Sequence, residues 1–282
     1  MKQPNLVEIF GSYTSWKIDD RTWVINFMNG SQNIYLLEGK EKALLIDTGW
    51  GAGNLRLYVE KLTDKPIMVV NTHYHPDHAG GNGEFEEVYM SKGATVDAMS
   101  LEGMLPCDIS KLPNPNYKKI YLRDGDTIEL GDRSVKIIEV LPAHCNSSLF
   151  LFDEEHGMFF CGDELEAGQI LLFDNSNNPN APYDVKIRLD NFKKNNENIK
   201  SLSDKIKYLL PNHNGQPITL SYVDDAIELV EHIYSGDAII EDKLNHPFIE
   251  KGDPKAPELC RVRWNNISIF IKKKDVMSVY GR

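Results

Sequence analysis

The stretch from His73 to Gly81, which reads His-Tyr-His-Pro-Asp-His-Ala-Gly-Gly, constrains this chain more than any other part of it. It follows the apolar run Ile67–Val70 and places three His and one Asp within six positions. In an extended chain, residues i and i+2 project to the same side, so His73 and His75 can converge on one metal ion. The alternative is that these side chains cap, pair or fill space near a turn, and it would require four such residues to cluster by chance.

Pro76 predicts a change of backbone direction directly after these two histidines. Pro is tolerated in the first turn of a helix, so we expect Asp77 and His78 at a strand-to-helix turn, where they can reach a second ion beside the first. Gly80 and Gly81 let the backbone pass close to such a site because they lack a Cβ atom.

Five separate apolar runs each end in a polar residue that could belong to the same site. In a sheet-based fold, side chains at strand ends gather along one edge of the sheets, where loops can shape a pocket. We therefore expect residues that are remote in sequence to join this stretch. The five residues are Asp47, His73, His144, Asp163 and His213.

These features resemble the motifs of the metallo-β-lactamase superfamily. The H-x-H-x-D-H signature of that family matches at all four ligand positions, and the further strand-end residues agree in order and setting over about residues 20–215. The resemblance implies an α+β fold, a four-layer αβ/βα sandwich in which two mixed β-sheets are flanked by helices. Helical patterns at Asn54–Lys65, Val185–Ser203 and Tyr222–Tyr234, set between short strand-like runs, fit this fold class.

The resemblance also implies two sets of metal ligands. Imidazole nitrogen and carboxylate oxygen suit zinc, so two divalent ions, zinc before iron or manganese, are the expected cofactors. Asp47 would be a carboxylate that holds a ligand-bearing loop in place. The first ion would be held by His73, His75 and His144, the second by Asp77, His78 and His213, and Asp163 would bridge the two.

The third motif departs from the family pattern. Family members often have Gly-His-Thr-Pro-Gly-Ser, whereas this chain has Ala-His-Cys-Asn-Ser-Ser from Ala143 to Ser148. Cys145 has two interpretations: a soft extra ligand or oxidisable neighbour of the metals, or a buried bystander. We favour the bystander.

The expected reaction is hydrolysis. Two divalent ions about 3.5 to 4 Å apart can share a water and lower its pKa from about 15.7 towards 7. Hydroxide is then the nucleophile, and Asp77 is the catalytic residue that orients it and shuttles its proton. Neither Ser nor Cys is needed as a nucleophile, which agrees with the absence of a Gly-x-Ser-x-Gly motif.

The substrate we expect is an ester, lactone or thioester of a small organic molecule, with a lactonase or esterase as first choice. Thioester hydrolysis of the glyoxalase II kind ranks lower because the substrate domain of that group is mainly helical, whereas Val262–Lys272 predicts a terminal hairpin. Tyr183 is a candidate hydrogen-bond donor to a substrate carbonyl. The alternatives are an iron-dependent oxidoreductase of the same fold, whose flavodiiron signature has Glu in place of His75, a phosphodiesterase, a β-lactam hydrolase, and a binding module stapled by its ions.

Composition limits the partners and the compartment. The formal net charge of −11, from 42 acidic and 31 basic residues, disfavours a broad nucleic-acid interface. The four cysteines lie far apart, as in a reduced cytoplasmic protein. Residues 1–6 lack the apolar core of a signal peptide, and no run of about 18 apolar residues predicts a membrane span. We expect a cytoplasmic enzyme with a small-molecule substrate and neither a nucleic-acid nor a membrane partner. The sequence leaves a homodimer open.

The length of 282 residues suits one large domain, and no internal repeat or low-complexity segment interrupts the chain. We expect residues 1–282 to form a single domain in which the helix and hairpin of residues 216–282 complete the core.

Overall fold

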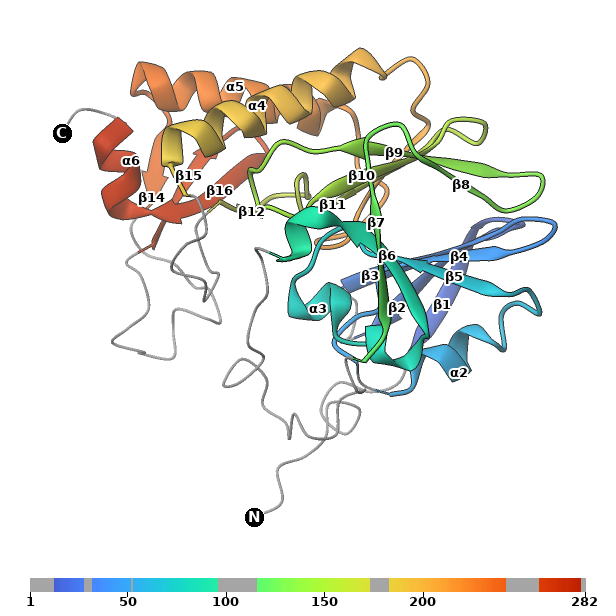
Figure 1. Ribbon diagram of the computed structural model, residues 1–282. Coiled ribbons are helices and arrows are strands. Elements are labelled where there is room, and N and C mark those ends of the chain that lie inside the picture. The colour runs from blue at the N-terminus through green and yellow to red at the C-terminus, as the bar shows by residue number, and fades with distance from the viewer. Residues whose placement is uncertain are drawn as a thin grey trace.

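The computed structural model describes residues 13–27, 32–51, 53–95, 116–172, 183–241 and 259–279. These residues form three β-sheets with helices on their outer sides (Figure 1). The α+β class predicted from the sequence is confirmed, and the organisation of the whole chain as a single domain stays a prediction.

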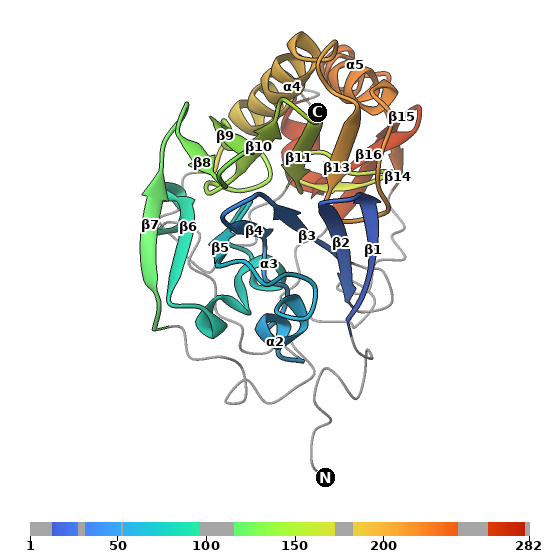
Figure 2. The same ribbon diagram turned by 90° about the vertical axis from the view of Figure 1, so that its right-hand side faces the viewer.

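Sheet A contains seven strands, which follow each other across the sheet in chain order (Figure 2). Its first four strands pair antiparallel and the last four pair parallel, so the sheet is mixed, as predicted. The strands are β1 (Thr14–Asp19), β2 (Thr22–Phe27), β3 (Gln32–Glu38), β4 (Ala43–Ile46), β5 (Ile67–Val70), β6 (Glu87–Ser91) and β7 (Lys118–Leu122).

Sheet B is also mixed, because β11 pairs parallel with β13 while its other pairs are antiparallel. Sheet C contains the predicted terminal hairpin, but its two remaining strands were not predicted. In the order in which they lie, the strands of sheet B are β13 (Tyr208–Pro211), β11 (Met158–Gly162), β10 (Leu149–Asp153), β9 (Ser134–Glu139) and β8 (Thr127–Glu129), and those of sheet C are β12 (Ile170–Leu171), β16 (Ile267–Lys272), β15 (Leu259–Trp264) and β14 (Ile239–Glu241).

Helices cover the outer side of each large sheet. α2 packs on sheet A, whereas α4 and α5 lie together over sheet B and sheet C (Figure 1). Two short 3-10 helices, Asn82–Glu84 and Lys92–Thr95, flank β6. The helices are α2 (Leu55–Val59), α3 (Pro76–Ala79), α4 (Val185–Ser201), α5 (Ser221–Ser235) and α6 (Lys273–Val279). None of these described helices combines the length and the apolar character that a membrane crossing requires.

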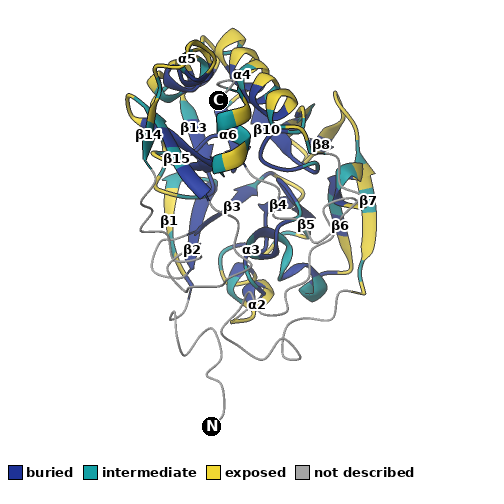
Figure 3. Cartoon of the chain, turned by 90° about the vertical axis from the view of Figure 1, so that its left-hand side faces the viewer, coloured by how far each residue is buried: buried dark blue, intermediate teal, exposed yellow. Residues whose placement is uncertain are grey.

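The central strands are buried on both faces, and this divides their side chains between separate cores. In β3, Ile34 and Leu36 belong to the core beneath α2, whereas Tyr35 and Leu37 belong to the core between sheets A and B. A third core lies between sheet B and the helices α4 and α5. Figure 3 shows the same layers, with buried strands in the middle and helices that expose one face on the outside. Helix, sheet, sheet and helix therefore form the predicted four-layer sandwich.

The two large sheets are joined at the edge where the predicted site residues lie. The backbone N–H of Asn33 donates to the carbonyl of Asn212 at 2.7 Å, which links β3 to the end of β13. The N–H of Leu149 at the start of β10 donates to the carbonyl of Thr72, just after β5, at 2.7 Å. The parallel pairs β4 with β5 and β11 with β13 therefore deliver their carboxyl ends to one place.

Candidate metal centre

The first predicted group of ligands is assembled from both sheets. His73 and His75 follow β5, and His144 lies in the loop between β9 and β10. The candidate ligand atoms of these three residues lie within 4.8 Å of one another. Nδ1 of His75 is 3.0 Å from Nε2 of His144, and all three imidazoles are buried.

The second group has Asp77, His78, Asp163 and His213, whose candidate ligand atoms also lie within 4.8 Å of one another. Asp77 and His78 are in α3, which begins at Pro76, so the predicted strand-to-helix turn is confirmed. Nε2 of His78 is 3.2 Å from Nε2 of His213, and Oδ2 of Asp77 is 3.5 Å and 3.2 Å from these two nitrogens.

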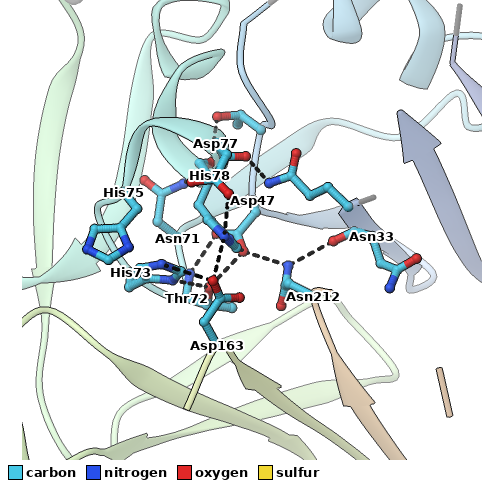
Figure 4. A network of polar contacts seen from close by, with 12 residues as sticks. Asn33, Asp47, Asn71, Thr72, His73, His75, Asp77, His78, Asp163 and Asn212 are labelled. Carbon is cyan, nitrogen blue, oxygen red and sulfur yellow. Dashed lines mark hydrogen bonds and ion pairs between the residues drawn. The ribbon is translucent and has the colours of Figure 1, made fainter. Parts of the chain in front are cut away.

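Asp163 lies between the two groups. Its Oδ2 atom is 3.3 Å from Nε2 of His78 and 3.5 Å from Nε2 of His213 in the second group. The same oxygen is 3.7 Å from Nε2 of His73 and 3.8 Å from Nε2 of His144 in the first group. Figure 4 shows the carboxylate directed at the imidazoles of His73 and His78.

The nitrogen and oxygen atoms of the two groups are arranged as metal ligands rather than as hydrogen-bond partners of one another. Nε2 of His73 and Oδ1 of Asp163 are buried and have no hydrogen-bond partner among the described residues. Two zinc ligands about 2.0 to 2.1 Å from a tetrahedral ion lie about 3.3 Å apart. The imidazole pairs at 3.0 and 3.2 Å are therefore spaced as ligands of shared cations would be.

In three of the histidines, the Nδ1 atom, which points away from the site, lies within hydrogen-bond distance of a neighbouring oxygen. When Nδ1 donates its hydrogen to such a neighbour, the lone pair of Nε2 points into the site. Each of these three rings is therefore held in the tautomer that a metal ligand needs. The neighbours are Oγ1 of Thr72 for His73 at 3.1 Å, Oδ2 of Asp47 for His78 at 2.9 Å, and the carbonyl of Leu171 for His144 at 2.8 Å.

Asp47 holds more than one loop. Its Oδ1 accepts the backbone N–H of Thr72 at 2.8 Å, and its Oδ2 accepts the Thr72 hydroxyl at 2.7 Å. Oδ2 also accepts the Asn212 amide at 2.8 Å and lies 2.9 Å from Nδ1 of His78 (Figure 4). The fully buried carboxylate thus contacts two segments that carry candidate ligands, the one after β5 and the one after β13, whereas the sequence predicted one.

Histidine pKa values are lowered in the first ligand group, at His75 and His144, and raised in the second, at His213. Burial lowers the pKa of His75 and of His144 to about 4, so both are neutral at pH 7, the form that can bind a metal. Burial also disfavours a charge on His213, but Asp163 and Asp77 outweigh it and raise the pKa of His213 to about 10. The carboxylates of the second group thus attract positive charge, which a bound cation would supply in place of a proton.

Two buried carboxylates beside the site were missed in the sequence. Glu164 accepts the backbone N–H of His144 at 3.2 Å, and Glu166 accepts the side-chain amide of Asn214 at 2.6 Å. Both follow Asp163 in the run Asp-Glu-Leu-Glu, where the density of acidic residues after a buried strand was the available signal.

Tyr183 and Cys145 lie at the margin of the centre. The Tyr183 hydroxyl is 3.2 Å from the carbonyl of Leu172 and 3.1 Å from Oδ2 of Asp275, so a substrate contact for it stays a prediction. Sγ of Cys145 is buried, 3.1 Å from the Ser148 hydroxyl, and neither ligand group found among the described residues includes it. This placement agrees with the bystander interpretation.

The fold and the candidate ligands at the strand ends define a class of metal-binding protein, and comparison with family models identifies the same class. The family model of the metallo-beta-lactamase superfamily matches residues 28–213, more than half of the chain. The chain therefore belongs to the metallo-beta-lactamase superfamily.

Relatives that are similar in sequence include two enzymes from different organisms. The acyl-coenzyme A thioesterase MBLAC2 of Gallus gallus is 27% identical over 165 residues, which cover 49% of this chain and 59% of that enzyme. This chain thus matches only somewhat more than half the length of that relative. The hydroxyacylglutathione hydrolase of Rippkaea orientalis is 23% identical over 240 residues, covering 79% of this chain and 82% of that enzyme.

A solved structure supports the fold. The metallo-beta-lactamase from Pontibacter korlensis matches with a TM-score of 0.56 at 17% identity, over 78% of this chain and 99% of that one. At this identity the likeness concerns the fold alone.

Proposed function

We propose that this protein is a dinuclear zinc-dependent hydrolase that cleaves thioesters of small organic acyl groups. The observation that carries the proposal is the position of Oδ2 of Asp163, 3.3 to 3.8 Å from imidazole nitrogens of both ligand groups. In this proposal His73, His75 and His144 would hold the first ion and Asp77, His78 and His213 the second, with Asp163 close to both groups.

The open side of the centre lies at the second group. The side chains of Asp77 and His213 are 19% and 20% exposed, whereas that of Asp163 is 8% exposed and those of His73, His78 and His144 at most 1%. Water and substrate can therefore approach past Asp77 and His213, with the first group as the floor of the site.

Bound at such a centre, two divalent ions would supply Lewis acidity that polarises a carbonyl and lowers the pKa of water. Asp77 is the group placed to take up the proton that the attacking water releases. Burial opposes a charge on this carboxyl, but His78 and His213 hold its pKa well below the usual value, so it is ionised at pH 7. Because its side chain is partly exposed, Asp77 can pass the proton on to solvent.

Sequence alone favoured a lactone or ester, and the relatives give a reason to place thioesters first. Acyl-coenzyme A and hydroxyacylglutathione are both thioesters, and these are the compounds in the names of the two relatives. Lactones and esters remain the second choice, because the same attack on a carbonyl carbon cleaves them.

The experiment is hydrolysis of a substrate panel by purified protein of known metal content. The panel contains acyl-coenzyme A, acylglutathione, a lactone, an aryl ester, a phosphodiester and a β-lactam. We expect the highest kcat/KM with a thioester, loss of that activity after dialysis against a chelator, and recovery with Zn²⁺. Thioester hydrolysis that persists in metal-free protein would refute the proposal, and iron in place of zinc would favour the oxidoreductase alternative.

A further inference from the structure

The loop that carries His144 rests on one face of helix α4. Asn191 donates its amide to the carbonyl of Pro142 at 2.8 Å. Asn195 pairs with Leu141 in both directions, donating to its carbonyl at 2.8 Å and accepting its N–H at 3.0 Å. Residues three and four positions apart share a helix face, so this polar face of α4 is dedicated to one loop.

Arg188, one turn earlier on the same face, binds the loop on both sides of His144. Its Nη1 donates to the carbonyl of Ala143 at 3.2 Å, and its Nη2 donates to Oδ1 of Asn146 at 2.9 Å. Arg188 is only 5% exposed, so its charge is removed from water, and these hydrogen bonds together with the electrostatic interaction with Glu164 help to offset that cost. The planar guanidinium fixes the distance between residues 143 and 146.

The loop of residues 143–148 also differs in composition from the family pattern. The family pattern often has Pro-Gly at the positions of Asn146 and Ser147, and Pro restricts the backbone by fixing φ. This chain has no Pro there, and Asn146 instead offers a side-chain oxygen, which Arg188 binds. In this loop the contact with Arg188 restricts the position of Asn146.

The remaining sides of His144 are already fixed by other elements. Its backbone N–H donates to Oε1 of Glu164 at 3.2 Å, and its Nδ1 lies 2.8 Å from the carbonyl of Leu171. The amide of Asn195 is 3.4 Å from Oε2 of Glu164, so α4 also reaches this second support. The contact with Leu171 orients the His144 ring, whereas α4 sets the position of the loop backbone that carries it.

We propose that Arg188 is a positioning residue that sets the affinity of the first ion site through the loop of His144. This inference rests on the proposed function, in which His73, His75 and His144 hold that ion. Partners that orient ligands typically contribute about 10- to 100-fold to metal affinity. Loss of Arg188 should weaken the first site by that factor and leave the second site unchanged.

The test is a Zn²⁺ titration of metal-free protein against a chromophoric chelator, for Arg188→Met, Arg188→Lys and Asn146→Ala. Lys194→Met is the matched control, because Lys194 is an exposed cation on the same helix. All variants are also made in a His213→Ala background, where the second group has lost one of its four candidate ligands and the first group is intact. We expect affinity in that background to fall about 10- to 100-fold for Arg188→Met, less for Arg188→Lys and Asn146→Ala, and not at all for Lys194→Met. The visible spectrum of bound Co²⁺ should change for the same variants.

A merely structural role would lower the melting temperature and leave the Zn²⁺ affinity of the first site and its Co²⁺ spectrum unchanged. Equal affinities for Arg188→Met and the wild type would overturn the inference. If Arg188→Met does not fold, Asn146→Ala decides the question, because Asn146 is half-buried and the change is small; its unchanged affinity would equally overturn the inference. Failure of the wild type to bind two ions would instead refute the proposed function.

Discussion

At the scale of single residues, Asp47 is the side chain on which most of the centre depends. It adopts a φ of 67°, a left-handed conformation that Asp tolerates better than most residues. From this turn after β4, its carboxylate contacts Thr72, His78 and Asn212. The apolar run before Asp47 predicted where it lies, but nothing in the sequence predicted how many segments it holds.

We expect Asp47→Ala to weaken zinc binding by about 10- to 100-fold, because the orientation of His78 and of the Thr72 loop is lost. It should also lower the free energy of unfolding by about 3 kcal/mol, because buried donors are left without an acceptor. Chelator competition and urea unfolding of metal-free protein measure the two effects. Asp64→Ala, at a side chain that is 87% exposed, is the control and should change neither. Wild-type values for Asp47→Ala would show that this carboxylate does not organise the centre.

Asp77 separates metal binding from chemistry. Asp77→Asn keeps the size of the side chain and an oxygen that can bind a metal but removes the proton acceptor. We expect kcat on a thioester to fall by about 100-fold or more with zinc in excess. Steady-state kinetics together with metal analysis measure this, and near-normal turnover with both ions bound would exclude Asp77 as the catalytic residue.

At the scale of secondary-structure elements, the sequence predicted the strands that form the sandwich because burial on both faces leaves long apolar runs. It did not predict β1, an edge strand in which no residue is buried and exposed residues do not alternate with half-buried ones. The apolar pattern of Asn54–Lys65 predicted a longer helix than α2, which ends at Val59. The helical pattern of Val185–Ser203 predicted α4, but periodicity does not show what a buried Arg188 binds.

A second element packs closely against the His144 loop. A Cβ atom on Gly93, in the 3-10 helix after β6, would overlap the carbonyl group of Asn146. We expect Gly93→Ala to displace the loop, to cost about 1 to 3 kcal/mol of stability and to weaken the first ion site. Thermal unfolding and zinc titration measure these effects.

Gly125→Ala is the control for this substitution. Gly125 has a φ of +81°, and a Cβ atom added there would meet nothing within 4 Å, so the change strains only its own turn. It should lower stability without changing zinc affinity. Equal zinc affinities for Gly93→Ala and Gly125→Ala would contradict the role of Gly93 in placing the loop.

At the scale of the whole molecule, each ligand group takes residues from both large sheets. His73, His75, Asp77 and His78 follow β5 of sheet A, whereas His144, Asp163 and His213 follow strands of sheet B. The sequence predicted this convergence because side chains at strand ends gather along one edge of the sheets in a sheet-based fold. It follows that metal binding would hold the two sheets together as well as create the site.

Zinc should therefore stabilise the folded protein. A ligand present at about 100 times its Kd adds about 2.7 kcal/mol per site to the free energy of unfolding. Differential scanning calorimetry with zinc and with a chelator measures this, and His213→Ala should lose part of the increase. An identical melting temperature with and without zinc would show that the ions do not connect the sheets.

The most direct measurement of the central claim is anomalous diffraction at the zinc absorption edge from crystals grown with Zn²⁺. We predict two anomalous peaks on either side of the Asp163 carboxylate, one among the imidazoles of His73, His75 and His144 and the other beside Asp77, His78 and His213. A single peak, or peaks away from Asp163, would contradict a dinuclear centre.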